Sequence, residues 1–542
     1  MATIKISKRE IEKFIKLDQK NLEKMNLMGI PVEAVHADEI ELEVLPNRPD
    51  VLSIQGYLRA LKAYFEVETG LKKYAIKKLE KNFKVTVDKS VKSVRPFTAC
   101  AIVKGLKFDD SKIKEIMDLQ EKLHLTLGRS RKKAAIGIYP LEKIMLPIKY
   151  EARKPQDIRF IPLESDEEMN GLEILQLHPT GREYASLLEG QKVFPVFVDA
   201  NDKILSMPPL INSHETGRIT GDTKEVFIEC SGFDLYLLKK ILNMVVTTLI
   251  DMGGEAYQME ISYSTDRETT PNLEPENMKI SLENVNKLIG LNLAESDLSK
   301  LLPRMGYDYK KGIVSIPAWR TDILHEVDII EDIAIAYGYD NLIPEIPQVA
   351  TIGEESKESK VKSKISDILT GLGLMETSSY HLIKEDEAKK SKLSEKIEVE
   401  NSRTEYKILR PNLLVPSLRI LSENKDADYP QKIFEMGTTF TLGKTETGIK
   451  ESENLIISCI PSNFTELKQT LDYLMRMLSI EYKIKDSPVK SMIDGRTASI
   501  IINSKEVGFI GEVHPEILDN WNIKQPLAVI EMSLDEIFNH FK

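Results

Sequence analysis

The stretch RTDILHEVDIIED, residues 320–332, combines the apolar spacing of a helix with a dense set of acids. Asp328, Glu331 and Asp332 stand at positions i, i+3 and i+4, which places their carboxylates on one helix face. Asp322 lies upstream, near the expected start of the helix. Like charges at this spacing repel, so the carboxylates are either solvated or compensated by a positive group.

Two interpretations of these four acids are open on spacing alone. Hard oxygen donors of this kind suit Mg²⁺, which favours carboxylate and water ligands. A charged stripe beside Val327, Ile330 and Ala334 is more commonly the solvated face of an amphipathic helix. The spacing by itself favours the solvated face.

The chain that contains this helix has 542 residues, which predicts about three to five domains. Its segments differ in kind. Residues 270–345 read as strand, two short helices, strand and a helix over about 322–337, which is consistent with a small helix-turn-helix-like module. Polar residues 350–362 predict a linker. Residues 360–542 predict an antiparallel sheet with flanking helices, so the fold class is α+β or mixed α/β, multidomain.

Two further modules are expected before the acidic helix. In residues 1–75, the turn PNRPD at 46–50 precedes a helix that Asp50 or Ser53 is expected to cap. Within residues 76–265, the segment 96–260 reads as mixed α/β. Strands are expected there at Thr98–Lys104, Phe194–Asp199 and Glu225–Cys230.

Composition and charge argue against several protein classes. The net charge of −11 argues against a surface built for non-specific nucleic-acid binding. The cysteines Cys100, Cys230 and Cys459 are far apart, which argues against a disulfide framework or zinc ribbon and fits a reducing cytoplasm. The most apolar long stretch, 235–252, is interrupted by lysines, so a core helix is expected there and no membrane span.

Several motifs together are similar to one family. PNRPD at 46–50 and PAWRTDILHEVDIIEDIAIAYGYDNL at 317–342 resemble the paired signature of the phenylalanyl-tRNA synthetase β chain, of archaeal/eukaryotic type. Further stretches resemble the family in the expected order: QEKLHLTLGRSRKK at 120–133, HPTGREYA at 178–185, LSMPPLINSHET at 205–216, QKIFEMG at 431–437 and GFIGEVHP at 508–515. The resemblance covers essentially the whole chain.

This resemblance implies an order of domains and separate roles for two subunits. It implies an N-terminal module at 1–75, an editing-type domain for tRNA deacylation at 76–265, a magnesium-binding module at 270–345 and a class II synthetase-like domain without catalytic motifs at 360–542. It also implies an α₂β₂ heterotetramer in which the α subunit joins phenylalanine to tRNA(Phe) with ATP. No residue of this chain is then expected to catalyse synthesis.

The resemblance also implies a Mg²⁺ site at the junction with the α subunit. Carried over position by position, its ligands are Asp322, Asp328, Glu331 and Asp332. The last position is often Glu in relatives, and Asp332 offers the same chemistry on a shorter arm.

An editing site has a clear physical reason. A pocket shaped for phenylalanine rejects tyrosine poorly, by roughly 10²-fold, because tyrosine only adds a hydroxyl. A second site that hydrogen-bonds the hydroxyl can select the error and hydrolyse it. We expect Leu205 as a ring contact and Asn212, Ser213 and Asp234 as polar groups of this pocket. The alternative is that Asn212 and Ser213 simply form a turn.

The C-terminal segment carries no recognisable phosphate-binding signature. It contains no Gly-rich phosphate loop. Arg410, before Pro411, is expected to be a salt-bridged structural arginine rather than a remnant phosphate clamp.

Two other functions compete with a ligase subunit. A free-standing deacylase of mischarged tRNA needs only the middle domain, so the acidic helix and the C-terminal domain speak against it. A non-catalytic RNA-binding scaffold is disfavoured by the acidic composition.

Overall fold

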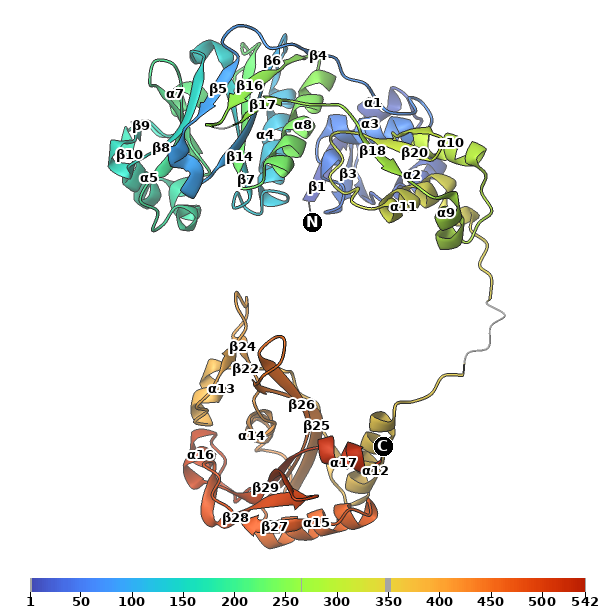
Figure 1. Ribbon diagram of the computed structural model, residues 1–542, viewed down its shortest axis with the longest axis vertical. Coiled ribbons are helices and arrows are strands. Elements are labelled where there is room, and N and C mark those ends of the chain that lie inside the picture. The colour runs from blue at the N-terminus through green and yellow to red at the C-terminus, as the bar shows by residue number, and fades with distance from the viewer. Residues whose placement is uncertain (1, 265, 347–351, 542) are drawn as a thin grey trace. The chain divides into compact units, whose positions relative to one another are not determined.

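The computed structural model describes residues 2–264, 266–346 and 352–541 (Figure 1). The chain divides into two compact units, Met1–Ile346 and Pro347–Lys542. Several sheets with helices packed on them confirm the expected mixed α/β, multidomain fold. No helix in the described residues has the length and apolar character needed to cross a membrane.

The first module is a small antiparallel sheet beside short helices. Its elements are β1 (Ala2–Ser7), α1 (Lys8–Glu12), α2 (Gln19–Asn26), β2 (Val32–Val35), β3 (Glu39–Val44) and α3 (Ile54–Tyr64). The sheet order is β1-β3-β2, and β3 alternates buried apolar residues with half-buried acids, as a strand with one face on a core does. The cap of α3 is Ser53, whose side chain accepts a hydrogen bond from the Gly56 amide, and not Asp50.

Two sheets stack face to face in the middle of the first unit. The strands are β4 (Ile76–Lys77), β5 (Lys84–Val87), β6 (Phe97–Lys104), β7 (Ala134–Pro140), β8 (Ile148–Arg153), β9 (Arg159–Phe160), β10 (Met169–Asn170), β11 (Phe194–Val198), β12 (Ile204–Met207), β13 (Ile211–Asn212), β14 (Val226–Gly232), β15 (Glu255–Tyr257), β16 (Met259–Ser262) and β17 (Arg267–Thr270). One stacked sheet has the order β13-β12-β11-β8-β5-β16-β17 and the other β4-β15-β6-β14-β7, while β9 and β10 pair as a separate two-stranded sheet. Buried residues of both sheets, among them Tyr139, Tyr150 and Phe227, form one cluster between them.

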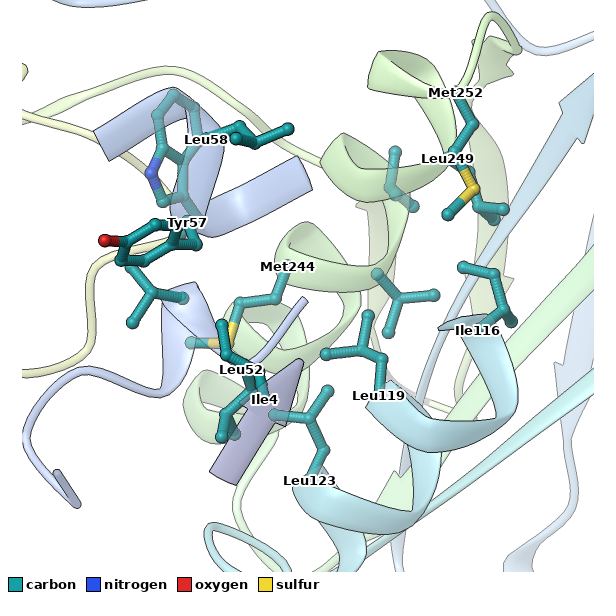
Figure 2. Close-up of a cluster of buried hydrophobic side chains, with 14 of the residues drawn as sticks. Ile4, Leu52, Tyr57, Leu58, Ile116, Leu119, Leu123, Met244, Leu249 and Met252 are labelled. Carbon is teal, nitrogen blue, oxygen red and sulfur yellow. The ribbon is translucent and has the colours of Figure 1, made fainter. Parts of the chain in front are cut away.

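Helices cover the outer face of the five-stranded sheet. The helices of this region are α4 (Asp110–Leu125), α5 (Gly171–Leu177), α6 (Pro179–Glu183), α7 (His214–Gly217) and α8 (Leu235–Asp251). Figure 2 shows Leu119 of α4 and Met244 of α8 in one cluster with Ile4, Leu52 and Tyr57 of the first module. Because residues 1–75 and 76–265 share this core, they belong to one compact unit, and the finer division into four domains stays a prediction.

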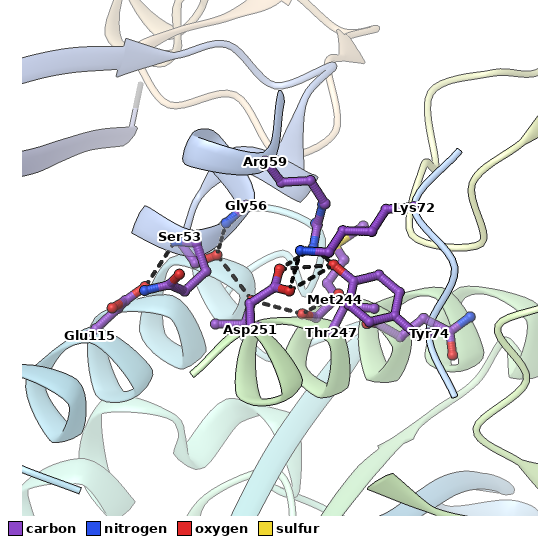
Figure 3. A network of polar contacts seen from close by, with 12 residues as sticks. Ser53, Gly56, Arg59, Lys72, Tyr74, Glu115, Met244, Thr247 and Asp251 are labelled. Carbon is purple, nitrogen blue, oxygen red and sulfur yellow. Dashed lines mark hydrogen bonds and ion pairs between the residues drawn. The ribbon is translucent and has the colours of Figure 1, made fainter. Parts of the chain in front are cut away.

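A polar network also joins the first module to α8. Asp251, at the end of α8, accepts hydrogen bonds from Arg59, Lys72 and Tyr74 at 2.8–3.0 Å (Figure 3). The Asp251 side chain is only 8% exposed, so the two cations compensate a nearly buried charge.

The acidic helix follows a small winged arrangement of strands and helices. Its elements are β18 (Glu276–Lys279), α9 (Leu282–Ile289), α10 (Glu295–Arg304), β19 (Asp308–Lys310), β20 (Ile313–Ile316) and α11 (Glu326–Tyr337). The strands pair antiparallel in the order β18-β20-β19. The expected helix start near residue 322 is wrong, because His325 is the N-cap and the Asp328 carboxylate accepts the amides of Leu324 and His325.

The second unit is a seven-stranded sheet with helices on both faces. Its elements are α12 (Lys357–Gly371), β21 (Met375–Glu376), β22 (Leu382–Lys384), α13 (Glu385–Lys390), β23 (Ile397–Glu398), β24 (Tyr406–Leu409), α14 (Leu414–Glu423), β25 (Gln431–Leu442), β26 (Ile449–Ile460), α15 (Phe464–Met477), β27 (Lys483–Asp486), β28 (Met492–Ile502), β29 (Lys505–Val513), α16 (Pro515–Asn520), β30 (Ala528–Ser533) and α17 (Asp535–His540). The sheet order is β21-β25-β26-β30-β29-β28-β27, antiparallel except for the parallel pair β21 and β25. A separate three-stranded sheet has the order β22-β24-β23. Apolar residues of α12, α15 and α17 pack on one face, and those of α14 and α16 on the other.

The linker expected at 350–362 is only partly borne out. Residues 350 and 351 lie outside the described part of the chain. The second half of the predicted linker is wrong, because Ser356 caps α12 and the helix begins at Lys357.

Candidate functional site

The acidic helix and the PNRPD turn meet at one cavity. Its volume is about 130 Å³. The four acids predicted as metal ligands line it together with two residues of the turn: Asp322, Asp328, Glu331, Asp332, Asn47 and Arg48. The fold therefore brings together two motifs that are far apart in the sequence.

A buried arginine compensates two of the four acids. Arg320 is 3% exposed, and its guanidinium donates to Asp322 from Nε at 2.8 Å and from Nη2 at 2.6 Å. Nη2 also lies 2.8 Å from Oδ2 of Asp332. Burial alone lowers the pKa of Arg320, but Asp332, Tyr307 and Asp322 outweigh it and raise that pKa well above its usual value. Arg320 therefore stays charged in the interior.

The other two acids have different surroundings. Oδ2 of Asp328 accepts the amides of Leu324 and His325, each at 2.8 Å, and so closes the first turn of α11. Glu331 is exposed and makes no hydrogen bond or ion pair in the part of the chain that the structure describes. Of the four carboxylates, Glu331 is thus the one without a partner among the described residues.

This arrangement does not fit a metal ion that is coordinated by all four carboxylates at once. Within residues 2–264, 266–346 and 352–541, no group of three His, Cys, Asp or Glu side chains is placed to hold a metal ion. Mg²⁺ often keeps several waters and takes one or two carboxylates. Glu331 and the free oxygen of Asp328 fit that mode, whereas Asp322 and Asp332 face Arg320. The four-residue ligand set stays a prediction.

A second cavity opens between the two stacked sheets of the middle domain. Its volume is about 170 Å³, and it is lined from α4 and from both sheets. The polar residues of its wall are Gln120, His124, Arg131, Glu164, Thr180, Ser206, Asn212 and Glu229. We call it the inner compartment.

Glu229 is a buried acid in the wall of the inner compartment. It is 2% exposed, and burial raises its pKa to about 8. The Tyr139 hydroxyl lies 3.2 Å from Oε1 of Glu229 and 3.2 Å from Oδ1 of Asn212. Oε2 of Glu229 is buried without a hydrogen-bond partner among the described residues. At neutral pH this carboxyl group is mostly protonated and has unused hydrogen-bonding capacity.

A larger cavity of about 690 Å³ adjoins the inner compartment. The two share the wall residues Gln120, Arg131, Leu163, Glu164 and Asn212. The remaining wall of this outer compartment mixes apolar and charged groups: Met117, Asp118, Glu121, Ile138, His214, Gly217, Arg218 and Ile219. The two compartments therefore adjoin along a shared wall.

Of the four residues predicted for an ester-hydrolysing pocket, only Asn212 lines these compartments. Leu205 is fully buried in the core between the sheets, and Ser213 is buried with its amide bonded to the Leu205 carbonyl at 2.8 Å. Asp234 is exposed and caps α8 through the amides of Tyr236 and Leu237. Leu205, Ser213 and Asp234 thus have structural surroundings outside the cavity walls.

Sequence reasoning missed Glu229 and Tyr139. The available signal was a single acid inside the apolar run VFIEC at 226–230, where a fully buried strand is expected. The partner strand carries Gly137 opposite Glu229. An added Cβ at Gly137 would lie 2.1 Å from the Tyr139 hydroxyl and 2.6 Å from Oε1 of Glu229, so the glycine leaves room for this polar group.

In the second unit, Arg410 has the expected structural role. It is 1% exposed, and its Nη1 lies 2.7 Å from Oε1 of Glu435 and 2.8 Å from the Ser379 hydroxyl. The pair is buried on both sides, so Arg410 is compensated within the unit.

Comparisons with family models, with related sequences and with solved structures all identify the same family. The model of the phenylalanyl tRNA synthetase beta chain CLM domain matches residues 343–534, and that of the tRNA synthetase B5 domain matches residues 278–339. The chain is 36% identical to the phenylalanine–tRNA ligase beta subunit of Archaeoglobus fulgidus, over 98% of this chain and 97% of the relative. It is 38% identical to that of Pyrococcus horikoshii, over 91% and 90%. A solved N-terminal fragment of the phenylalanyl-tRNA synthetase beta-subunit from Pyrococcus horikoshii superposes with a TM-score of 0.59 at 36% identity, covering 62% of this chain and all of the fragment.

Proposed function

This chain belongs to the phenylalanine–tRNA ligase β-subunit family, and we propose that it both supports synthesis on a partner subunit and removes tyrosine wrongly attached to tRNA(Phe). It is a subunit of an aminoacyl-tRNA ligase, and a β subunit implies an α partner and a tRNA. ATP and phenylalanine are assigned to the α subunit, in an α₂β₂ assembly. The cysteines are free and buried, which supports a cytoplasmic location.

The observation that carries the editing role is the buried Glu229 in the inner compartment. A tyrosine side chain brings a hydroxyl that can accept a hydrogen bond from protonated Glu229 and donate one to Asn212. Phenylalanine would leave these buried groups unpaired, at a cost of roughly 1–3 kcal/mol each. A site of this kind selects the hydroxylated side chain far better than an apolar pocket rejects it.

The reaction assigned to this site is hydrolysis of the ester between tyrosine and the terminal ribose. The water oxygen bonds to the carbonyl carbon, the bond from that carbon to the ribose oxygen breaks, and the ribose oxygen takes a proton. Tyrosine and intact tRNA are released. Because Glu229 holds a proton below about pH 8, its role is recognition of the hydroxyl and not removal of a proton from water.

For the acidic helix, we propose a Mg²⁺ site at the boundary with the α subunit. Glu331 and Asp328 would hold the ion, with water and groups of the partner completing its shell. The ion supplies positive charge to a face where Arg320 compensates only Asp322 and Asp332. This role is structural, because synthesis is assigned to the α subunit.

A free-standing deacylase or an RNA-binding scaffold is not favoured. Either would leave the second unit without a role, yet residues 343–534 match the domain model of the β chain.

The test uses the chain co-expressed with its α subunit and each subunit alone. Phenylalanine-dependent ATP–pyrophosphate exchange is expected only from the mixed subunits, at equal stoichiometry. Exchange by either subunit alone, or a chain that elutes folded and never pairs, would refute the supporting role.

A further inference from the structure

The turn between α4 and β7 has an unusual backbone. Arg129, Ser130 and Arg131 follow one another with φ of 47°, 52° and 65°, in the left-handed region that residues with a Cβ rarely adopt. Backbone hydrogen bonds hold it in place: Arg131 N donates to the His124 carbonyl at 3.2 Å, and Lys133 N to the Gly128 carbonyl at 2.7 Å. We call residues 126–133 the basic turn.

Arg131 fixes the basic turn to the wall of both compartments. Its guanidinium donates to the Leu210 carbonyl at 2.7 Å and to Glu121 at 3.2 Å. It also lies over the Tyr184 ring, 4.4 Å from the centroid. The position of the turn relative to the cavity is therefore set by several contacts.

The other cations of the turn are free. Arg129, Lys132 and Lys133 are exposed, and their side chains make no ion pair or hydrogen bond within the described residues. Arg218, in the wall of the outer compartment, likewise has no side-chain partner there.

The charged residues that line the outer compartment are two arginines and three acids: Arg131, Arg218, Asp118, Glu121 and Glu164. Glu121 is occupied by Arg131, and the unpaired acids of the outer compartment are Asp118 and Glu164. Arg129, Lys132 and Lys133 adjoin Arg131 in the sequence, so the basic turn adds three unpaired cations next to a residue of this wall. Unpaired cations of this kind hold flexible single-stranded RNA by contacting its phosphates.

We propose that the basic turn, with Arg218, holds the phosphates at the single-stranded 3′ end of an RNA whose terminal ester lies in the cavity. This inference rests on the proposed editing function and names the element that receives the RNA. Arg131 positions the turn, and Arg129, Lys132 and Lys133 contact the backbone. Such contacts are independent of base sequence and sensitive to salt.

The test compares two substrates of the full chain in complex with its α subunit: tyrosyl-tRNA(Phe) and tyrosyl-adenosine, which has the same ester without the preceding phosphates. The variant Arg129→Gln/Lys132→Gln/Lys133→Gln keeps the side-chain length of the turn nearly unchanged. The control Lys287→Gln/Lys300→Gln/Lys310→Gln removes three exposed, unpaired cations outside the cavity wall.

For the turn variant, we expect KM for tyrosyl-tRNA to rise roughly tenfold or more. The slope of log KM against log salt should fall by about 2, because each of the three lost phosphate contacts contributes roughly 0.7. Hydrolysis of tyrosyl-adenosine should change less than about twofold. The control should leave both substrates unaffected.

Equal losses on both substrates, or an unchanged KM for tyrosyl-tRNA, would overturn the inference while leaving the editing function standing. If the unsubstituted complex hydrolyses neither substrate, the editing function itself is refuted. Binding of an uncharged acceptor-stem minihelix, followed by fluorescence anisotropy, then decides the inference: equal affinity for the turn variant and the control overturns it.

Discussion

The Tyr139 hydroxyl and the Glu229 carboxyl oxygen lie 3.2 Å apart in the narrow space between two stacked sheets. Tyr139 has one proton to share between Glu229 and Asn212, so the pair remains incompletely hydrogen-bonded. Incomplete pairing of buried groups is costly in a purely structural core. A ligand that brings its own hydroxyl would complete it.

Selectivity for a tyrosyl ester should depend on pH through Glu229. Its folded-state pKa is raised by burial from about 4.5 to about 8, so it donates a hydrogen bond at neutral pH and loses that ability above pH 8. We expect the ratio of tyrosyl-tRNA to phenylalanyl-tRNA hydrolysis to fall above pH 8. In Glu229→Gln, which always donates, the ratio should stay flat; a parallel fall in both proteins would contradict the assignment.

The same pKa has a consequence for stability. A carboxyl group whose folded-state pKa is raised contributes stability below its unfolded pKa and loses it as pH rises through the folded value. The contribution of Glu229 should therefore decline from about pH 4.5 to about pH 8. Thermal unfolding of the parent and of Glu229→Gln across this pH range measures the contribution. If the variant loses stability as steeply as the parent, Glu229 is not the source of the pH dependence.

Gly137→Ala should damage editing and leave synthesis intact. The added Cβ would meet the Tyr139 hydroxyl at 2.1 Å and displace it from Glu229. We expect at least a tenfold loss of tyrosyl-tRNA hydrolysis, with phenylalanine-dependent pyrophosphate exchange within twofold of the parent.

Gly221→Ala is the matched control, because the nearest atom to its Cβ would be the Phe108 carbonyl oxygen at 3.9 Å. Loss of exchange in Gly137→Ala, together with a lowered melting temperature, would show that the substitution acts through folding and not through the pocket.

Arg320→Met should destabilise the first unit. It leaves the buried carboxylate of Asp332 and the half-buried carboxylate of Asp322 without this cation, and breaking a buried pair from one side typically costs about 3–5 kcal/mol. Adding Asp332→Asn should recover part of the loss, because one of the uncompensated charges is then removed. Denaturant unfolding of both variants measures the change in the free energy of unfolding. Equal stability of Arg320→Met and the parent would contradict the account.

Glu331→Gln should weaken subunit association without affecting folding. Glu331 is exposed and has no partner among the described residues, so its removal costs the isolated chain little. If it helps to hold Mg²⁺ at the boundary, the variant should dissociate from α at lower chelator concentration than the parent, as seen by native mass spectrometry. Glu283→Gln, another exposed and unpaired acid, should behave like the parent.

Local patterns predicted much of the fold. The strands predicted at Thr98–Lys104, Phe194–Asp199 and Glu225–Cys230 correspond to β6, β11 and β14. Of the two residues predicted as the cap of α3, Ser53 caps it. The predicted start of α11 near residue 322 is wrong because His325 is the N-cap and the Asp328 side chain accepts its amide. Spacing alone does not distinguish a carboxylate with that role from a metal ligand.

The candidate pocket could not be predicted in the same way. Asn212, one of the residues predicted from the sequence, lines the cavity, but Glu229 lies in its wall only because β7 pairs with β14 and places Gly137 opposite it. Such pairing joins residues that are far apart in the chain, and the sequence marks it only by one acid in an apolar strand. Asp234 has the polar character of a site residue but serves as a helix cap.

The most direct test of the account is hydrolysis of tyrosyl-tRNA(Phe) and phenylalanyl-tRNA(Phe) by the complex carrying Glu229, Glu229→Gln or Glu229→Leu. We expect the parent and the Gln variant to hydrolyse the tyrosyl ester selectively at pH 7, and the Leu variant to lose at least a hundredfold of that activity. Pyrophosphate exchange should be unchanged in all three. Full activity of Glu229→Leu on tyrosyl-tRNA would contradict the assignment of this cavity as the site that recognises tyrosine.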